Sequence, residues 1–313
     1  MKVYTSLEAA SDGALRDVAL CLGNFEGVHL GHRALFEEAM RHGPPAALTF
    51  SPHPAKVLRP ALAPRRITSP ARKLELFAQS GLVAAIVQPF SIEYAKTTAQ
   101  EFETVLFDKV AIGHVVVGYN FTYGAGRLGN VQTLKVAAGK RGREVSAISP
   151  VVVNDVVVSS SKICEYILEG HMEAAATLLG RPFDMDGTVV RGAGLGRRIG
   201  FPTANIDSPY ELRPAAGVYA VRLQQAGTWH SGAANIGTKP TFGGNEVMIE
   251  AHLLDFTGDL YGQQVRLQFM KRLRAEEYFP SQQALARQLK KDIEEARKIL
   301  SIRSHSVKND VLG

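Results

Sequence analysis

The sequence contains few residues of the kinds that characterise disulfide-linked or membrane-spanning proteins. Its 313 residues include only two cysteines, Cys21 and Cys164, and one tryptophan. Two cysteines cannot form a disulfide framework, and their scarcity is typical of a reducing compartment such as the cytoplasm. No apolar run approaches the roughly 20 residues that a membrane-spanning helix needs, and the N-terminus lacks the apolar segment of a signal peptide. We therefore expect a cytoplasmic protein without a membrane partner.

Low-complexity tracts and internal repeats are also missing, which argues against disorder and against a solenoid. The formal net charge is only +6, and a cut after Leu179 leaves 18 lysines and arginines on each side. Because neither part has a basic tail or a sustained cationic helix face, a nucleic-acid partner is not expected. A modest positive surplus suits small polyanions equally well. The length exceeds that of a usual single domain and favours two domains.

Residues 18–150 alternate short apolar runs with amphipathic stretches. The expected strands are Val18–Gly23, Ala46–Ser51, Ala84–Pro89, His114–Gly118 and Glu144–Ile148. The expected helices lie near Gly31–His42, Ala71–Gln79, Thr98–Asp108 and Val131–Arg141. Such alternation indicates an α/β fold with a parallel sheet, whose ligand site should lie at the carboxyl ends of the strands. Two short helices interrupted at Gly170 are expected over residues 160–179.

After Gly180 the pattern changes to short β-type segments separated by turns rich in glycine, proline and asparagine. The expected strands include Gly187–Val190, Val218–Leu223, Ala233–Ile236, Val247–Leu254 and Gln264–Phe269. This pattern predicts a small antiparallel β-barrel. A long helix opened by Ser281 should follow, with an apolar face formed by Leu285, Leu289, Ile293, Ala296 and Leu300. We therefore expect domains over residues 1–178 and 179–303, and a tail over residues 304–313.

A turn rich in glycine and histidine joins the first expected strand to the first expected helix. Glycines let the backbone approach a ligand, and the helix N-terminus offers free N–H groups to phosphate. His29 and His32 form an HxGH motif there. They can donate hydrogen bonds to phosphate oxygens and stabilise charge on a leaving pyrophosphate. The motif alone is equally typical of a tight turn with surface histidines, and two histidines alone do not make a metal site.

A second glycine-rich segment precedes the residues Pro202-Thr203-Ala204-Asn205. Its glycines suit a flexible flap whose amides close over phosphates. Thr203 and Asn205 alternate on one side of an extended strand, so a hydroxyl and an amide oxygen can face the same Mg²⁺. A β-turn region with polar caps is the alternative interpretation. Glu250 lies in the segment Val247–Leu254, where alternation by itself predicts a solvent-facing carboxylate.

The first part of the chain resembles the bacterial FAD synthetases, a family of HxGH nucleotidyltransferases. The resemblance covers residues 15–175 and is carried by GNFEGVHLGH, LTFSPHP, VVVGYNFTYGAGRLGN and VVVSSSKI. It implies that ATP binds near the two histidines and that the FMN phosphate attacks the α-phosphorus as pyrophosphate leaves. The implied phosphate-binding residues are Gly23, Asn24, Phe25, Gly31, Ser159, Ser160 and Ser161. The implied flavin-binding residues are His53, Asn120 and Arg127.

The second part resembles the riboflavin kinases from residue 179 to about 300, through LGRPF, GFPTANI, ANIGTKPTF, IEAHLLDF and LRAEEYF. The resemblance implies a six-stranded barrel with Thr203 and Asn205 at the Mg²⁺-ATP site. Gly194, Gly196 and Arg197 would contact phosphate. Glu250 would act as the base on the terminal ribityl hydroxyl of riboflavin. Together the two resemblances imply a bifunctional enzyme that binds riboflavin, FMN, FAD and ATP; self-association stays open.

The sequence departs from the first family's pattern at three positions. Glu26 and Asn130 each stand where aspartate is common, and Cys164 stands where the serine motif usually ends in arginine. An arginine could make two hydrogen bonds to the polyphosphate, whereas cysteine makes neither. The alternative to the bifunctional hypothesis is therefore a riboflavin kinase with a weakened nucleotidyltransferase domain. Arg127 is the candidate for a substitute cation.

Overall fold

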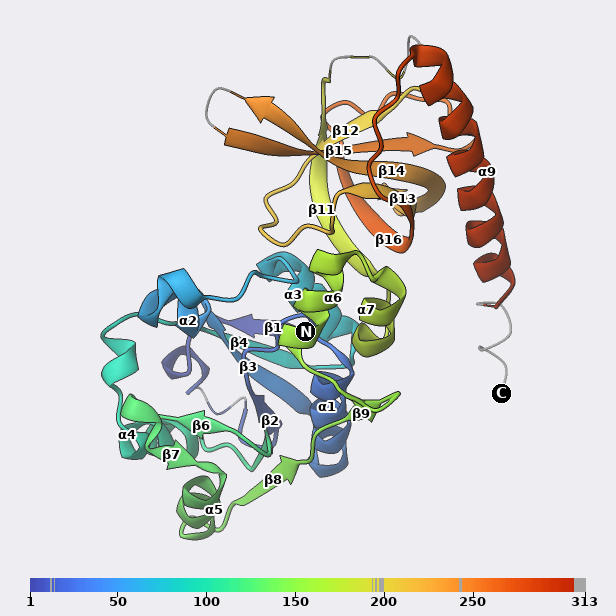
Figure 1. Ribbon diagram of the computed structural model, residues 1–313. Helices are drawn as coiled ribbons and strands as arrows, with labels where there is room; N and C mark the ends of the chain where they lie inside the picture. Colours follow the sequence, from blue (N-terminus) through green and yellow to red (C-terminus); the bar gives the residue numbers. More distant parts are fainter. Residues whose placement is uncertain are drawn as a thin grey trace. The chain divides into compact units, whose positions relative to one another are not determined.

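The computed structural model describes residues 1–306 except 12, 14, 193, 195, 197–199, 242 and 243. For residues 238–241, 244–246 and 302–306 the backbone alone is described. The chain divides into two compact units, Met1–Ser161 and Lys162–Gly313 (Figure 1). This division falls inside helix α6 (Ser160–Glu169), whereas the sequence pattern places the domain boundary after residue 178.

The first unit contains a six-stranded sheet in the order β1-β4-β3-β2-β5-β8. Each neighbouring pair is parallel. The strands are β1 (Lys2–Tyr4), β2 (Ala19–Leu22), β3 (Pro45–Ser51), β4 (Ala84–Pro89), β5 (His114–Gly118) and β8 (Glu144–Ile148). The parallel α/β expectation is confirmed, and five strands lie where the sequence predicts them. β1 was not predicted, because a strand of three residues is too short to show a periodic pattern.

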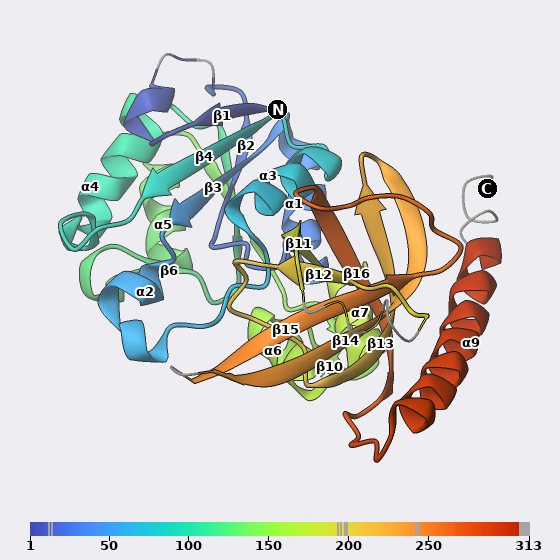
Figure 2. The ribbon, with the colours of Figure 1, turned by 90° about the horizontal axis from the view of Figure 1, so that it is seen from above.

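Helices cover both faces of this sheet (Figure 2). Those that pack on one face are α1 (Leu30–His42) and α3 (Pro70–Gln79), and those on the other are α4 (Ala99–Glu103), the π-helix Thr104–Lys109 and α5 (Val131–Gly139). Successive strand residues point to opposite faces, so Cys21 packs with the α1 side and Leu20 with the α4 side. Cys21 is fully buried, as expected for a small apolar residue, and burial raises the pKa of its thiol.

Shorter elements connect these layers. They are η1 (Glu8–Ala10), α2 (Pro54–Leu58), η2 (Pro60–Leu62), η3 (Tyr94–Lys96), β6 (Thr122–Tyr123), η5 (Ala125–Arg127), β7 (Gly129–Asn130), β9 (Val152–Val153) and β10 (Val156–Val157). A capping box opens α4, where Glu101 N donates to Thr98 Oγ1 and Thr98 N donates to Glu101 Oε2. Asn130 caps α5 by accepting from the N–H groups of Gln132 and Thr133. Asparagine and aspartate are equally good N-cap residues, so Asn130 can cap α5 where aspartate is common.

The second unit is built around a closed barrel with the strand order β11-β12-β15-β14-β13-β16. The strands are β11 (Phe183–Val190), β12 (Ala204–Asp207), β13 (Gly217–Gln225), β14 (Thr228–Thr241), β15 (Gly244–Leu253) and β16 (Gln264–Arg274). All six pairings are antiparallel, which confirms the predicted six-stranded barrel. β12 has only four residues, and two of its side chains are polar. It lies in the segment where the alternation of Thr203 and Asn205 indicates an extended strand.

Two helices flank the barrel within the second unit. α7 (Met172–Leu179) packs on β11 and β16, and it is separated from α6 by Gly170, whose φ is +82°. α9 (Gln282–Ser306) packs on β13, β14 and β16, as Figure 1 shows. Ser281 accepts from Ala284 N, which confirms the predicted start of α9. The helix continues to Ser306, into the range predicted as a tail, and residues 307–313 lie outside the described part.

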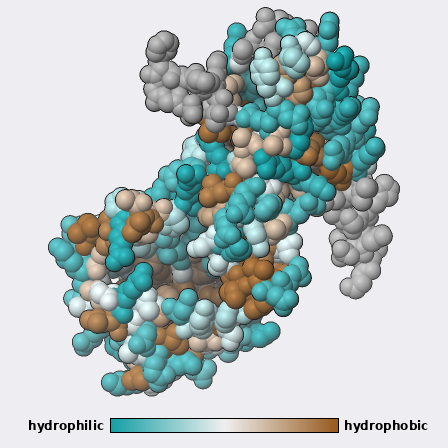
Figure 3. All heavy atoms as spheres, viewed as in Figure 1, coloured by the Kyte–Doolittle hydropathy of each residue, from teal (hydrophilic) through white to brown (hydrophobic). Residues whose placement is uncertain are grey.

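The described helices include none that combines the length and apolar character needed to cross a membrane. On the face drawn in Figure 3, hydrophobic residues form separate patches among hydrophilic ones.

Candidate active sites

The HxGH turn leaves β2 through three residues with unusual backbone conformations. Phe25, Gly27 and Val28 have φ of +48°, +83° and +44°. Glycine adopts such angles without strain, but residues with a side chain do so only when their surroundings enforce it. Phe25 and Val28 are both fully buried under α1 and α3. Core packing therefore holds the turn in one shape.

His29 and His32 lie together at the N-terminus of α1. His29 is the N-cap residue, and its Nδ1 accepts from His32 N at 3.3 Å. The two rings stack with their centroids 3.6 Å apart. A Cβ on Gly31 would lie 3.1 Å from His29 Cε1, so glycine gives the His29 ring its place over the helix end. Because Nδ1 accepts, the ring proton lies on Nε2, which makes that nitrogen a donor suited to phosphate.

A buried ion pair between Glu26 and Lys73 attaches the same turn to α3. Glu26 Oε1 accepts from the N–H groups of Ile67 and Thr68, both at 2.9 Å. Lys73 Nζ lies 3.6 Å from Glu26 Oε2 and donates to the carbonyl oxygen of Asn24 at 2.8 Å. Burial lowers the pKa of Lys73, and the charge of Glu26 opposes that shift. Glu26, which stands where aspartate is common, is thus buried and links the turn to residues 67–68 and to Lys73.

Sequence reasoning did not identify Lys73. One feature of the sequence could have indicated it: Lys73 lies three and four positions before Leu76 and Phe77, and therefore on the same, buried face of α3. A cation at a position that the pattern assigns to the core requires a buried partner. Only the fold supplies that partner, because Glu26 lies on the turn that follows β2.

The serine motif reaches this turn through one described contact. Ser160 Oγ donates to the carbonyl oxygen of Glu26 at 2.9 Å. Ser159 is half-buried beside it, and Ser161 is exposed. The structure therefore brings Ser160 to the HxGH turn, as a shared phosphate site requires. On α6 the Lys162 ammonium forms an ion pair with Glu165, and Cys164 is half-buried.

The three predicted flavin-binding residues follow strands adjacent to β2. His53 follows β3, and Asn120 and Arg127 follow β5, so all lie beyond the carboxyl ends of the three strands β3-β2-β5. His53 Nδ1 accepts from Ala55 N and caps α2, and its pKa is lowered mainly by burial. His53 therefore has a structural role as the cap of α2. Asn120 and Arg127 are exposed.

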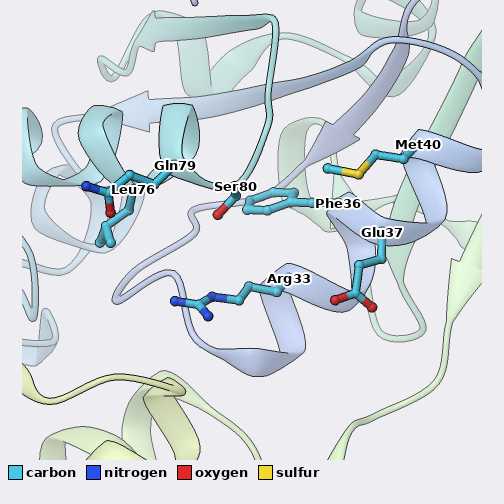
Figure 4. A pocket seen from close by; sticks show the side chains of 7 residues that line it. All are labelled: Arg33, Phe36, Glu37, Met40, Leu76, Gln79 and Ser80. Atoms are coloured by element: carbon cyan, nitrogen blue, oxygen red, sulfur yellow. The ribbon is translucent and has the colours of Figure 1, made fainter. Parts of the chain in front are cut away.

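A cavity of about 270 Å³ lies between α1 and α3, as Figure 4 shows. It is lined by Arg33, Phe36, Glu37, Met40, Leu76, Gln79 and Ser80. The Phe36 ring in its wall packs against Phe25, with ring centroids 5.2 Å apart, and against Phe77, with ring centroids 5.6 Å apart. Phe25 in turn meets the His32 ring edge-on at 5.2 Å. This aromatic cluster supports the HxGH turn, and the cavity contains none of the predicted site residues.

The second candidate site lies on the barrel. Glu250 of β15 is directly paired with Asn205 of β12 on one side and with Asn235 of β14 on the other. Directly paired residues point to the same face of a sheet, so a carboxylate and two amides gather there. Glu250, Asn235 and Thr203 line a cavity of about 320 Å³, whose apolar wall includes Leu285, Leu289 and Ile293 of α9. The solvent-facing expectation for Glu250 is therefore wrong: it is half-buried, because α9 packs near that face.

Glycines of the flap make close contact with the predicted metal ligands. A Cβ on Gly192 would lie 2.1 Å from Asn205 Nδ2, and one on Gly196 would lie 3.2 Å from Thr203 Oγ1. Gly194 has a φ of +69°. Arg197 lies outside the described residues. These glycines let the flap backbone pack directly on the two polar side chains.

Two further residues line this cavity and were not among the predicted site residues. His252 lies two positions after Glu250 on the same face, and its Nδ1 is 2.8 Å from the carbonyl oxygen of Pro202. Arg274 makes three hydrogen bonds to the buried carboxylate of Asp292 on α9. His252 thereby positions the segment that carries Thr203. The Arg274–Asp292 pair joins α9 to the barrel where both residues line the cavity.

Known families match both parts of the chain. A family model for FAD synthetase matches residues 12–162, and one for riboflavin kinase matches residues 179–300. The two matches do not overlap, and between them lie most of α6 and nearly all of α7.

Relatives match the chain over nearly its whole length. A bifunctional riboflavin kinase/FMN adenylyltransferase of Escherichia coli (strain K12) is 34% identical over 309 residues, which cover 96% of this chain and 99% of the relative. A protein of the same name from Haemophilus influenzae is 33% identical, over 90% of this chain and 94% of the relative. A crystal structure described as a macrolide-efflux protein from Streptococcus pneumoniae has a TM-score of 0.84 and 30% identity, over 94% of this chain and 98% of that one.

Proposed function

The chain belongs to the bifunctional riboflavin kinase/FMN adenylyltransferase family, and we propose that its two candidate sites carry the two ATP-dependent reactions of that family. The barrel site phosphorylates riboflavin to FMN. The HxGH site transfers the adenylyl group of ATP to FMN, which yields FAD and pyrophosphate. One observation supports this division above all: the stacked histidines and the Glu250–Asn205 pair lie in different compact units.

We assign the adenylyl transfer to the turn between β2 and α1. A phosphate oxygen of FMN attacks the α-phosphorus of ATP, and the bond to pyrophosphate breaks. His29 Nε2 and the His32 ring stabilise the charge that develops on the leaving pyrophosphate. The N-terminal amides of α1, the backbone from Gly23 to Phe25 and the Ser160 region contribute further phosphate contacts. His53, Asn120 and Arg127 bind the flavin from the loops that follow β3 and β5.

We assign riboflavin phosphorylation to the cavity between the barrel and α9. Glu250 accepts the proton of the terminal ribityl hydroxyl, and the resulting oxygen attacks the γ-phosphorus as ADP leaves. Gly194, Gly196 and Arg197 of the flap contact the ATP phosphates. The apolar wall from α9 supports binding of the flavin ring.

Mg²⁺ fits the donors that the barrel offers. Thr203 supplies a hydroxyl oxygen and Asn205 an amide oxygen, and hard oxygen donors of this type suit Mg²⁺ bound together with ATP phosphates. When bound, Mg²⁺ would neutralise charge on the transferred phosphoryl group. The pairing of Asn205 with Glu250 would keep the base beside these ligands.

We also propose a cytoplasmic location and a functional boundary near Leu178. Neither Cys21 nor Cys164 is paired in a disulfide, which is typical of a reducing compartment. The boundary follows the start of the riboflavin kinase match at residue 179.

The test is to assay both half-reactions on one purified sample. Riboflavin with Mg²⁺-ATP should give FMN and ADP, and FMN with Mg²⁺-ATP should give FAD and pyrophosphate. FMN formation without any FAD formation would instead support the kinase with a weakened first domain, for which the half-buried Cys164 is the motivating observation. Absence of both products in a folded sample would contradict the assignment of both sites.

A further inference from the structure

A second pair of histidines lies at the end of the parallel sheet opposite the HxGH turn. His114 begins β5 and Glu144 begins β8, and the two residues are paired in register. His42 is the last residue of α1, which packs on both strands. The amino ends of the strands gather here, whereas the candidate phosphate site lies at their carboxyl ends. Neither proposed reaction uses this cluster.

The two rings are held in a defined arrangement. The His42 and His114 rings stack with centroids 3.7 Å apart and planes 8° apart. Ser146 shares a strand face with Glu144, and its Oγ lies 2.9 Å from His114 Nε2 and 3.5 Å from His42 Nε2. Both rings therefore turn their Nε2 edges toward the same hydroxyl.

Neighbouring groups determine which ring nitrogens are available. His42 Nε2 lies 3.0 Å from Glu38 Oε1, and because a carboxylate accepts, this nitrogen carries the proton. The Nδ1 lone pair of His42 is then available for a ligand bond. His114 Nδ1 faces Glu144 Oε2 at 3.7 Å, on the ring edge opposite Ser146. A carboxylate that orients a metal-binding imidazole through its other nitrogen is a recurrent feature of metal sites.

From this arrangement we propose that His42, His114 and Glu144 bind a divalent transition metal ion of the Zn²⁺ class. One ligand atom from each residue lies within 4.8 Å of the other two. Bonds of about 2.0–2.1 Å require ligand atoms at most about 4.2 Å apart. An imidazole nitrogen binds a metal in the plane of its ring, so the His42 ring must turn out of its stack with His114, and Glu144 must move closer, before the three residues can share one ion. The Glu144 side chain is 81% exposed and is free to make this movement.

The chemistry of the three ligands selects the ion. Two imidazole nitrogens and one carboxylate oxygen suit Zn²⁺, Ni²⁺ or Cu²⁺, whereas Mg²⁺ prefers oxygen ligands alone. The carbonyl end of α1, a helix of 13 residues, adds a negative dipole end that favours a cation. Water would fill the remaining coordination positions. A bound ion would join the last turn of α1 to β5 and β8, and α1 is the helix that carries the HxGH motif at its other end.

The test is titration of the full-length, metal-free chain with ZnCl₂ by calorimetry, and with CoCl₂ by visible absorption. His42→Gln and Glu144→Gln remove ligands at accessible positions, while Glu38→Gln keeps all three ligands and removes the orienting carboxylate, which also pairs with Arg41. His171→Gln is the matched control, because His171 forms an exposed ion pair with Glu169 at 3.2 Å. A variant with His29→Asn and His32→Ala separates this cluster from the HxGH turn.

We expect one Zn²⁺ per chain, and a rise in the thermal midpoint when it binds. His42→Gln and Glu144→Gln should each weaken binding at least about tenfold, and Glu38→Gln about 10- to 100-fold. His171→Gln and the HxGH double variant should leave affinity unchanged. The proposal is overturned if the folded chain shows no saturable binding, or if binding persists in His42→Gln and Glu144→Gln. Binding lost only in the double variant also overturns it, since the ion would then sit at the HxGH turn.

Discussion

Lys73 Nζ donates to the carbonyl oxygen of Asn24 at 2.8 Å and lies 3.6 Å from Glu26 Oε2, so one ammonium on α3 holds two neighbouring residues of the turn after β2. Both side chains are nearly inaccessible, with 11% of Lys73 and 6% of Glu26 exposed. Glu26 also accepts from two backbone N–H groups of residues 67–68. The HxGH turn is therefore attached to α3 by charge as well as by aromatic packing.

Lys73→Met should destabilise the first unit and depress FAD synthesis. Removal of one partner leaves the Glu26 carboxylate buried without its cation, which costs about 3–5 kcal/mol in comparable pairs. Urea unfolding and the rate of FAD formation from FMN measure the two effects. Lys73→Met combined with Glu26→Gln should recover part of the stability, and Lys135→Met is an exposed lysine control. Wild-type stability of the single variant would show that the ion pair contributes nothing.

His29→Ala and His32→Ala should each reduce FAD synthesis and spare riboflavin phosphorylation. Loss of one donor to developing charge lowers a rate by about 10²- to 10³-fold in related chemistry. His29→Asn tests the mechanism more sharply, because asparagine is a good N-cap residue and keeps α1 capped without an imidazole. Steady-state rates with FMN and Mg²⁺-ATP provide the measurement. Near-normal activity of His29→Asn would mean that His29 caps the helix and does not contact phosphate.

Glu250→Gln should reduce FMN formation by about 10²- to 10⁴-fold, the range expected when a positioned base is removed. Adenylylation of supplied FMN should not change. Asp255→Asn is a suitable control, since the Asp255 carboxylate forms an exposed ion pair with Arg297 on α9. Phosphorylation rates should be measured at saturating Mg²⁺-ATP. A loss below about tenfold would return Glu250 to a structural role.

Cys164→Arg should accelerate FAD synthesis if the site lacks the cation that related sequences place there. An arginine would add one or two charge-assisted hydrogen bonds, each worth about 1.5–3 kcal/mol. The apparent affinity for ATP should rise together with the rate, while kinase activity stays constant. If the folded variant shows no gain, Arg127→Ala becomes the next test. A harmless Arg127→Ala would then contradict the proposed binding of phosphate by the first unit.

Truncation should separate the activities, but the starting residue should matter. A chain that begins at Leu178 should keep riboflavin phosphorylation and lose all FAD formation. A chain that begins at Lys162 should have the same activity and higher thermal stability, because α7 packs on β11 and β16 and Glu173 lies 3.8 Å from Lys271. Circular dichroism melting compares the two. Equal melting temperatures would show that α7 adds nothing to the barrel, and a folded but inactive Leu178 chain would place the boundary elsewhere.

The order of strands and helices in both units follows from the sequence, because it depends on local periodicity. Alternation of apolar runs with amphipathic stretches places β3, β4, β5 and β8 within a residue of their observed bounds. Ser281 marks the start of α9 through a contact only three residues long. Motifs confined to one turn, such as HxGH, are likewise visible because their residues adjoin in the chain. A strand of three residues such as β1 has no pattern of its own and cannot be recognised in this way.

The tertiary structure alone decided which distant residues meet. Lys73 reaches a turn 49 positions earlier, and Glu250 is placed beside Asn205 by strand pairing and beside an apolar helix by the packing of α9. His42 and Glu144 come together because α1 crosses the sheet just where β5 and β8 begin. Periodicity indicates whether a position faces a core or solvent, but it does not identify the residue that the side chain will contact. Burial and charge pairing depend on that contacting residue. Strand order and helix packing determine which residue it is.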